Sequence, residues 1–346
     1  MSLILGIEST CDETAAAVVA DGRVVRSSIV ATQFDLHRIY RGVVPEIASR
    51  AHIENILPVL RESLSADGIS LADVDAIAVS QRPGLIGSLL IGVTAAKTLA
   101  WATDKPLVGV DHVQAHLYSV MLDSEAAPDL PAVGLVASGG HTALYLIRSW
   151  TDITRLGGTI DDAVGEAYDK VAAILGLPYP GGRPIDELAA KGNPKAIKFP
   201  RPLLDRDDLD FSFSGLKTSV LYHVRGHKGR ERTEPLSDTE LRDVCASFQQ
   251  ACIDVLTTKI RRAVRQHNAQ SVIVGGGVSA NHGLRAALPS LQVPTYLPQL
   301  KYCTDNAAMI AGLGQVMLNA DITSDLGMDA ITFSALVPSP GTPGEG

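Results

Sequence analysis

Two stretches of the chain, about 130 residues apart, share one arrangement of apolar and polar residues. In each, an apolar run is followed by a short polar turn and a second apolar run. Such runs predict β-strands, and a short polar link between two of them predicts a hairpin. The segments are 3–8, 9–14 and 15–20 in the first copy, and 132–137, 138–142 and 143–150 in the second. A helical pattern follows each copy, so the repeat predicts a duplicated α/β domain with a ligand cleft between its halves.

A third feature is a glycine cluster late in the chain, "SVIVGGGVSANHGLR" (271–285). It predicts a buried strand, a glycine turn that a ligand can approach closely, and a helix that begins near Ala280. The spacing matches neither G-x-G-x-x-G nor G-x-x-x-x-G-K-[ST], which argues against Rossmann and P-loop folds. Two hairpin turns plus such a glycine turn are typical of the actin-like, sugar-kinase-like (ASKHA) ATPase fold. We predict that two-lobe fold, with 1–115 and about 305–330 in the first lobe and 116–304 in the second.

Composition and the apolar runs narrow the class of protein. With 346 residues, 20% of them charged, the chain predicts a packed soluble protein of two domains. Its first apolar run stops at Glu8 without a basic segment before it, which predicts a strand rather than a signal peptide. The longest apolar stretch, 84–96, is too short to span a bilayer. The four cysteines form no C-x-x-C pair, so we expect a reduced, cytoplasmic protein without a membrane partner. The Pro/Gly-rich tail 337–346 predicts disorder.

The formal net charge of −8 gives little general help to nucleic-acid binding, because such affinity comes largely from neutralised phosphates. Two local segments, 37–52 and 225–232, are nevertheless rich in basic residues. Segments of this kind are usually solvated loops. If the protein binds a nucleic acid, we expect it to need partner subunits.

The segment "GVDHVQAHLYSV" (109–120) carries two histidines at a spacing of four, His112 and His116. On an α-helix this spacing places side chains on one face, with Cβ atoms about 5–6 Å apart, so both rings can hold one metal ion. The alternative is that one ring caps a carbonyl and the other is a core histidine. No carboxylate lies between them, so the general base of an H-E-x-x-H protease helix is absent.

Nine motifs follow one another between residue 3 and about residue 317. They are "GIESTCDETAAAVV", "GVVPEIASRAHIENI", "PGLIGSLLIGVTAAKTLA", "GVDHVQAHLYS", "ASGGHTALY", "GEAYDKVAAILGLPYPGG", "FSFSGLKTSV", "VGGGVSAN" and "CTDNAAMIA". In this order they closely resemble the tRNA N6-adenosine threonylcarbamoyltransferases (TsaD/Gcp). We expect two departures from the family pattern, at Arg41 and Arg82, to affect tRNA or partner contact rather than the chemistry.

The resemblance implies the ASKHA fold and a definite reaction. A threonylcarbamoyl group would pass from threonylcarbamoyl-adenylate to the N6 amine of adenosine 37, in tRNAs that read codons beginning with A, and AMP would be released. The family also works with a paralogous inactive subunit and a small ATPase, so these and tRNA are the expected partners.

The resemblance further implies a metal site. His112 and His116 match the family's His-x-x-x-His, and Asp305 in "CTDNAAM" matches its third ligand. Two imidazoles and a carboxylate leave positions open for a substrate, and we expect one divalent ion, iron(II) or alternatively zinc. Read alone, Asp305 could equally cap the helix that follows it.

The second polar turn is implied to bind the phosphoryl group of the donor through its backbone N–H groups. The residues implied in this turn are Val136, Ala137, Ser138, Gly139 and Gly140. His141 would point toward the same cleft if the turn is a hairpin tip. Otherwise it is a solvent-facing turn histidine.

Four more residues are implied to hold the nucleoside. By the resemblance, Asp169 accepts from the ribose hydroxyls, Gly182 and Asp186 close over the sugar, and Asn281 reaches the adenine or the phosphate. Asp186 could instead be a charge near a helix N-terminus.

The acidic turn "ESTCDET" carries Glu8, Asp12 and Glu13. We hypothesise that Glu13 or Asp12 helps to deprotonate the adenosine amine as it attacks the carbamoyl carbon, whose carbonyl is polarised at the metal. With His141, these two form the predicted catalytic set.

Other interpretations remain open from the sequence. An ATP-dependent kinase or chaperone-type ATPase shares the fold but does not explain why the two histidines and Asp305 should converge. A non-catalytic scaffold subunit should have lost metal ligands, whereas all three are present here. A carbamoyltransferase that acts on a small metabolite is the nearest enzymatic rival. Ser214 and Lys217 resemble a Ser–Lys nucleophile pair, but the alternating Phe211 and Phe213 favour a packing role.

Overall fold

The structure of the protein is a computed structural model, and it describes residues 1–40, 42–227, 230–231 and 234–334. Three expectations fall wholly or partly outside this part of the chain. The tail 337–346 and Arg41 are not described, and the basic segment 225–232 has described side chains only up to residue 226.

The chain divides into two compact units. The first contains Met1–Ala127, Arg148–Arg155 and Thr304–Gly346, and the second contains Pro128–Ile147 and Leu156–Cys303. The lobe boundaries and the cleft expected from the sequence stay predictions, and each unit is described by itself below.

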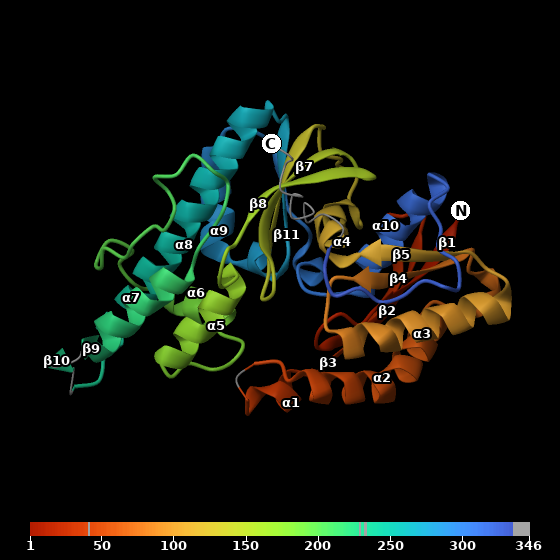
Figure 1. Ribbon diagram of the computed structural model, residues 1–346, viewed down its shortest axis with the longest axis horizontal. Coiled ribbons are helices and arrows are strands. Elements are labelled where there is room, and N and C mark those ends of the chain that lie inside the picture. The colour runs from red at the N-terminus through yellow and green to blue at the C-terminus, as the bar shows by residue number, and fades with distance from the viewer. Residues whose placement is uncertain (41, 228–229, 232–233, 335–346) are drawn as a thin grey trace, which may run out of the picture. The chain divides into compact units, whose positions relative to one another are not determined.

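The first unit is built on a five-stranded mixed sheet with the strand order β3-β2-β1-β4-β5 (Figure 1). β2 runs antiparallel to both β1 and β3, whereas β4 and β5 continue the sheet in parallel with β1. The strands are β1 (Leu3–Glu8), β2 (Glu13–Ala20), β3 (Val24–Thr32), β4 (Ala76–Arg82) and β5 (Leu107–Asp111). Every residue of β1 and β2 is buried, as expected for strands covered on both faces.

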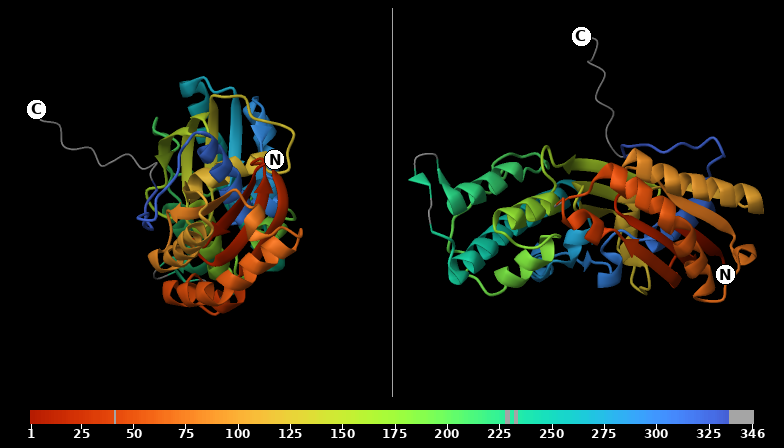
Figure 2. Two further views of the ribbon diagram at one scale, coloured as in Figure 1. Left: turned by 90° about the vertical axis from the view of Figure 1, so that its right-hand side faces the viewer. Right: turned by 90° about the horizontal axis from the view of Figure 1, so that it is seen from below.

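Helices cover both faces of this sheet. α2 (Pro45–Ser65) and α3 (Ile86–Thr103) lie side by side against one face, and α10 (Ala307–Asn319) packs across the other (Figure 1 and Figure 2). The short helix α1 (Phe34–Arg38) precedes α2. A further short helix, α4 (His112–Tyr118), follows β5 without an intervening loop.

The second unit repeats the arrangement of strands. Its order β8-β7-β6-β11-β12 again has an antiparallel hairpin followed by two parallel strands. The strands are β6 (Ala132–Ala137), β7 (Thr142–Ser149), β8 (Asp152–Gly158), β11 (Ser271–Gly275) and β12 (Thr295–Tyr296). The duplication predicted from the two strand–turn–strand segments is therefore confirmed.

The helices of the second unit gather around one long helix. They are α5 (Val164–Ile174), α6 (Gly182–Ala189), α7 (Ser214–Arg225), α8 (Asp238–His267) and α9 (His282–Ala287), and the short hairpin β9 (Gly226–His227) and β10 (Arg230–Glu231) follows α7. α8 begins at a capping box, in which Ser237 and Glu240 exchange side-chain to backbone hydrogen bonds. α8 packs along α6, and its apolar face joins the buried core of this unit.

The predicted strands 3–8 and 132–137 have those bounds in the structure. The two polar turns are shorter than predicted, because Glu13 opens β2 and Thr142 opens β7. The predicted helix near Ala280 was placed too early: residues Gly277–Ala280 form a 3-10 turn, and α9 begins at His282.

Among the described residues, α3 is the one helix that is long and apolar enough to cross a membrane. Core helices of soluble proteins pass the same test of length and composition, and α3 packs against α2 and β4. The apolar stretch 84–96 has thirteen residues, whereas α3 has 18. The helix is longer because Lys97 interrupts the apolar run but does not end the helix.

Candidate metal centre and ligand-binding turns

The two histidines of the first unit stand on one short helix that begins directly after a sheet strand. Asp111, the last residue of β5, caps α4 by accepting hydrogen bonds from the backbone N–H groups of Val113 and Gln114 at 3.0 and 3.2 Å. His112 and His116 therefore occupy successive turns of the same helix face, and their ring centroids lie 4.6 Å apart. Both side chains are buried.

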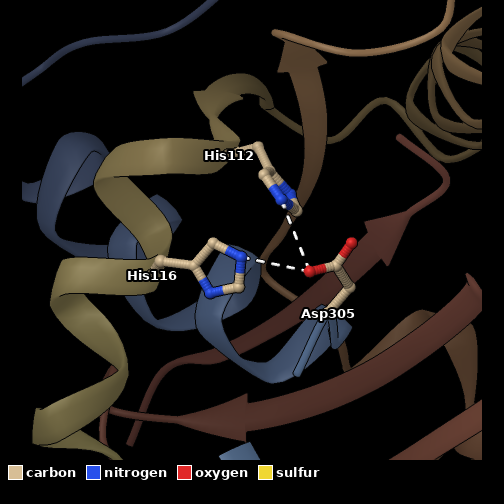
Figure 3. A group of neighbouring side chains, drawn as sticks. All are labelled: His112, His116 and Asp305. Carbon is tan, nitrogen blue, oxygen red and sulfur yellow. Dashed lines mark hydrogen bonds and ion pairs between the residues drawn. The ribbon is translucent and has the colours of Figure 1, made fainter. Parts of the chain in front are cut away.

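Asp305 completes the cluster from the start of α10 (Figure 3). One oxygen of its carboxylate lies 3.1 Å from Nε2 of His116 and 3.6 Å from Nε2 of His112. The capping role considered for Asp305 belongs to its neighbour, because Asn306 accepts from the backbone N–H of Met309 at 3.0 Å. The Asp305 carboxylate is thus turned toward the two imidazoles.

Glu8 sets the orientation of the first imidazole. This carboxylate is fully buried at the end of β1, and one oxygen lies 2.9 Å from Nδ1 of His112. Its other oxygen accepts from the backbone N–H of Thr10 at 2.6 Å. Because a carboxylate can only accept here, Nδ1 of His112 carries the hydrogen and Nε2 faces Asp305. The sequence analysis placed Glu8 in the acidic turn but missed this contact.

Charge raises the pKa of His112. Burial alone lowers the pKa of an imidazole, but the neighbouring carboxylates of Glu8 and Asp305 outweigh it and raise the pKa of His112 to about 9. Without another cation in the cluster, this imidazole is therefore positively charged at neutral pH, with a hydrogen on both nitrogens.

The donor set fits a divalent metal ion. One ligand atom from each of His112, His116 and Asp305 can be chosen so that all lie within 4.8 Å of one another. Two imidazole nitrogens and one carboxylate oxygen suit zinc or iron(II), and such a set leaves coordination positions free. The Glu8 contact to Nδ1 is the outer carboxylate that metal-bound histidines commonly have.

The acidic turn lies beside this cluster in the same unit. Asp12 and Glu13 are 8% and 7% exposed. Burial, together with the charge of Asp305, raises the pKa of both carboxyl groups, and the pKa of Glu13 rises well above its usual range. The turn is packed closely by the glycine-rich start of α3: a Cβ added at Gly84 would lie 2.7 Å from the carbonyl oxygen of Thr10.

The second polar turn, Ser138 to His141, is the tip of the β6–β7 hairpin, as predicted. The backbone N–H of Ser138 donates to the carbonyl of His141 at 2.8 Å, and Oγ of Ser138 accepts from the backbone N–H of His141 at 3.1 Å. Space is open above Gly139 and Gly140, where an added Cβ would meet no atom within 4 Å. The strand residues Val136 and Ala137 before the turn are fully buried, and their predicted role in binding the donor stays a prediction.

Two glycines bring other segments against this turn. A Cβ at Gly165, in the first turn of α5, would lie 2.5 Å from the carbonyl oxygen of Ser138. A Cβ at Gly276 would lie 2.4 Å from the carbonyl oxygen of Ala137, and the φ of Gly276 is +88°. The hairpin tip, the start of α5 and the glycine turn before α9 therefore meet in one place within the second unit.

The four predicted nucleoside-binding residues lie in the same unit. Asp169 on α5 accepts from the backbone N–H of Gly181 at 2.7 Å, beside the open face of Gly182 at the start of α6. Asp186 on α6 and Asn281 before α9 are joined through hydrogen bonds to Gln249, a buried residue of α8. The sequence analysis did not find that connecting residue, because nothing in its local pattern distinguishes it from a core-facing helix position.

The "FSFSGLKTSV" motif has a structural role. Oγ of Ser214 donates to the Asp161 carboxylate at 2.8 Å, and Nζ of Lys217 forms an ion pair with Asp162 at 2.8 Å. Both Phe211 and the neighbouring Phe213 are fully buried. These contacts tie the start of α7 to the loop before α5, so the Ser–Lys pair is engaged with carboxylates rather than with each other.

A family model described as tRNA N6-adenosine threonylcarbamoyltransferase (TsaD) matches residues 24–312. Curated proteins that carry this name are similar over nearly the whole chain. The protein of Trichlorobacter lovleyi is 51% identical over 332 residues, which cover 95% of each chain. The protein of Moorella thermoacetica is 51% identical over 311 residues, which cover 89% of each chain.

Solved structures with low sequence identity share the fold. HypF of T. kodakarensis has a TM-score of 0.62 at 16% identity, covering 92% of this chain and 48% of that one. Component A of the (R)-2-hydroxyglutaryl-CoA dehydratase of Acidaminococcus fermentans has a TM-score of 0.54 at 16% identity, covering 92% and 100%. The ROK hexokinase of Thermus thermophilus has a TM-score of 0.50 at 13% identity, covering 92% and 99%. These similarities confirm the predicted actin-like, sugar-kinase-like fold.

The nine ordered motifs therefore find their counterpart in a family model that spans most of the sequence and in relatives at about half identity. With the repeated sheets and the His-His-Asp cluster in place, the chain belongs to the TsaD family of tRNA N6-adenosine threonylcarbamoyltransferases.

Proposed function

We propose that the protein transfers the threonylcarbamoyl group of threonylcarbamoyl-adenylate to the N6 amine of adenosine 37 in tRNAs that read codons beginning with A. The observation that carries this proposal is the match to the family over residues 24–312, within which two buried histidines and the partly exposed Asp305 form one cluster. A kinase of the same fold would have no use for such a cluster.

The cluster of His112, His116 and Asp305 would hold one divalent ion, and we propose iron(II), with zinc as the alternative. Bound there, the ion supplies Lewis-acid polarisation of the carbamoyl carbonyl. Glu8 keeps Nε2 of His112 directed into the site by accepting from Nδ1.

We assign the proton transfer to the acidic turn. The N6 amine attacks the carbamoyl carbon, the new N–C bond forms, and the bond from that carbon to the phosphate oxygen breaks. AMP leaves with the electron pair, and the amine proton passes to Glu13, with Asp12 as the alternative acceptor. The raised pKa of Glu13 supports this role, because a carboxylate with a higher pKa is a stronger base once it is deprotonated.

The second unit would bind the adenylate. The open backbone of Gly139 and Gly140 can donate N–H groups to a phosphoryl oxygen, with His141 beside them. Asp169 would accept from the ribose hydroxyls, and Gly182 and Asp186 would close over the sugar. Asn281 would reach the adenine or the phosphate.

We further propose that the protein works in the cytoplasm with a paralogous inactive subunit and a small ATPase. Exposed apolar side chains at helical spacing support a helix-packing partner: Ile53 and Leu57 on α2, and Ile86 and Leu90 on α3, are each at least 45% exposed. Such a group on neighbouring helices is typical of a protein–protein contact.

The test is transfer of label from threonylcarbamoyl-adenylate to unmodified tRNA in a cell extract depleted of this protein and then resupplied. Wild type and the His112→Ala/His116→Ala variant would be compared, with His267→Ala as a control at the end of α8, far along the sequence from the cluster. We expect label with wild type and the control alone. No label with wild type, while adenylate and metal still bind, would favour a carbamoyltransferase with a different acceptor.

A further inference from the structure

One buried glutamine in the second unit joins two of the predicted adenylate-binding residues. Gln249 lies near the middle of α8 and is 7% exposed. Its Nε2 donates to the carboxylate of Asp186 at 3.0 Å, and its Oε1 accepts from Nδ2 of Asn281 at 2.8 Å. The hydroxyl of Tyr168 also donates to this oxygen, at 3.4 Å. A single side chain therefore contacts α5, α6 and the turn before α9.

The direction of these hydrogen bonds follows from chemistry. The carboxylate of Asp186 can only accept, so Nε2 of Gln249 must face it and Oε1 must face Asn281. Asn281 is then obliged to present Nδ2 to Gln249, which leaves its Oδ1 to accept from the backbone N–H of Leu284 at 2.8 Å and cap α9. Asp186 therefore fixes the orientation of the Gln249 amide, and the Gln249 amide in turn fixes that of Asn281.

The backbone leaves room for this connection. A Cβ added at Gly283 would lie 2.6 Å from Nε2 of Gln249 and 3.3 Å from Oδ1 of Asn281. Any larger residue at position 283 would push the two amides apart. The second oxygen of Asp186 is held separately, by the backbone N–H and Nδ1 of His282 at 3.0 and 2.7 Å.

We propose that Gln249 is a positioning residue of the adenylate site, which holds Asp186 and Asn281 in the orientation in which they meet the nucleotide. This inference rests on the proposed function, because it takes those two residues to face the adenylate. Gln249 itself is buried, and the role assigned to it is to hold these two residues rather than to contact the nucleotide. Loss of Gln249 removes the shared partner of the carboxylate and the amide, so, among the described residues, the side chain of Asp186 is held by His282 alone and that of Asn281 only by the backbone N–H of Leu284.

The first experiment measures the affinity of the purified full-length protein for AMP, the nucleotide product, by calorimetry. Gln249→Met keeps the side-chain volume and removes both hydrogen-bonding groups. We expect its affinity for AMP to fall about tenfold, the usual effect of one lost hydrogen bond to a charged group. Gln250→Met is the matched control. The side-chain amide of Gln250, next in the sequence, donates to Asp254 at 2.7 Å and not to Asp186, so the Gln250→Met variant should bind AMP as wild type does.

A double-mutant cycle separates positioning from general damage. In the Asp186→Ala/Asn281→Ala background, Gln249→Met should weaken AMP binding by no more than about twofold further, because its targets are gone. An equal loss in both backgrounds would contradict the proposal, and so would wild-type affinity in the single Gln249→Met variant.

A second pair of variants applies if Gln249→Met does not fold. Gln249→Glu keeps the shape but places a carboxylate against Asp186, and it should weaken AMP binding in the wild-type background. In the Asp186→Asn background a donor again faces an acceptor, so Gln249→Glu should there cause little further loss. Equal losses in the two backgrounds would overturn the proposal.

These outcomes are distinguishable from failure of the proposed function. A wild-type protein that binds no AMP and transfers no label contradicts the adenylate site as a whole. A wild type that binds AMP and transfers label, beside a Gln249→Met variant that does both equally well, contradicts the positioning role alone.

Discussion

The contact between Glu8 and His112 joins the first strand of the sheet to the helix that carries both histidines. Glu8 is fully buried, so its charge acts on the imidazole with little screening by water. The contact does two things: it directs Nε2 of His112 toward Asp305, and it raises the pKa of the ring against the effect of burial.

Substitution of Glu8→Gln should weaken metal binding. The change keeps the shape of the side chain but removes the charge that orients and polarises the ring of His112, and loss of such an outer carboxylate costs about 10–100-fold in metal affinity. The measurement is competition for Zn²⁺ against a chromogenic chelator. Glu62→Gln on α2 is the control and should bind zinc as wild type does. Wild-type affinity in Glu8→Gln would contradict the orienting role.

Metal affinity should also depend on pH. The Nε2 proton of His112 must leave before the ring can ligate a cation, and the pKa of this ring is about 9 in the metal-free protein. The apparent affinity for Zn²⁺ should therefore rise about tenfold for each unit of pH between about 7 and 8.5, with one proton released on binding. Calorimetry in buffers of different ionisation enthalpy counts that proton. An affinity that is flat over this range would show that the ring is already neutral.

At this scale the sequence predicted some residues and missed others for a physical reason. His112 and His116 are four apart on one helix, so their proximity follows from local geometry. Asp305 was named only through the family resemblance. The contact of Glu8 with His112 and the connection made by Gln249 depend on how distant segments pack, which no local pattern encodes.

At the scale of elements, the segment after α10 acts as a strap along the edge of the first sheet. The strap, residues 322–334, is held at Ser324, whose backbone N–H donates to the carbonyl of Leu107 at 2.8 Å. At its end, the hydroxyl of Ser334 donates to Asp111 at 2.6 Å. Asp111 is the residue that caps α4, the helix of the two histidines. The strap therefore holds both β5 and the start of α4.

Removal of the apolar anchor of this strap should destabilise the protein. Met328 is 7% exposed and lies directly over Gly109 of β5, where an added Cβ would come within 2.5 Å of its sulfur. Met328→Ala should lower the free energy of unfolding by about 2–3 kcal/mol through lost burial and the cavity left behind. Urea denaturation measures the change. Leu326→Ala, at a position 46% exposed on the same strap, is the control and should cost well under 1 kcal/mol. Equal effects of the two substitutions would contradict the anchoring role.

The elements themselves followed largely from sequence pattern, and the errors have identifiable causes. The apolar runs of β1 and β6 were predicted with their bounds, because both strands are buried throughout. The turns were predicted too long because Glu13 and Thr142 are polar residues that nevertheless pair in the ladders. The start of α9 was misplaced because Asn281, which caps it, lies after a 3-10 turn that the pattern did not reveal.

At the scale of the whole molecule, one strand order occurs twice and each copy supplies a different part of the proposed chemistry. The first copy carries the His-His-Asp cluster and the acidic turn, and the second carries the open glycine turn and the residues predicted to bind the nucleoside. The duplication was predictable because both copies keep the strand–turn–strand pattern. The lobe boundaries expected from the sequence stay predictions, and the chain crosses between the two units at several points.

The measurement that tests the account most directly is the identity of the modified nucleoside. The purified protein, with the proposed partner subunit and ATPase, would be given threonylcarbamoyl-adenylate and either of two tRNA transcripts, one with adenosine and one with guanosine at position 37. The tRNA would then be digested to nucleosides and analysed by mass spectrometry. The account predicts N6-threonylcarbamoyladenosine from the adenosine transcript alone, with AMP released in equal amount. Equal modification of both transcripts, or none while a small amine accepts the group, would contradict it.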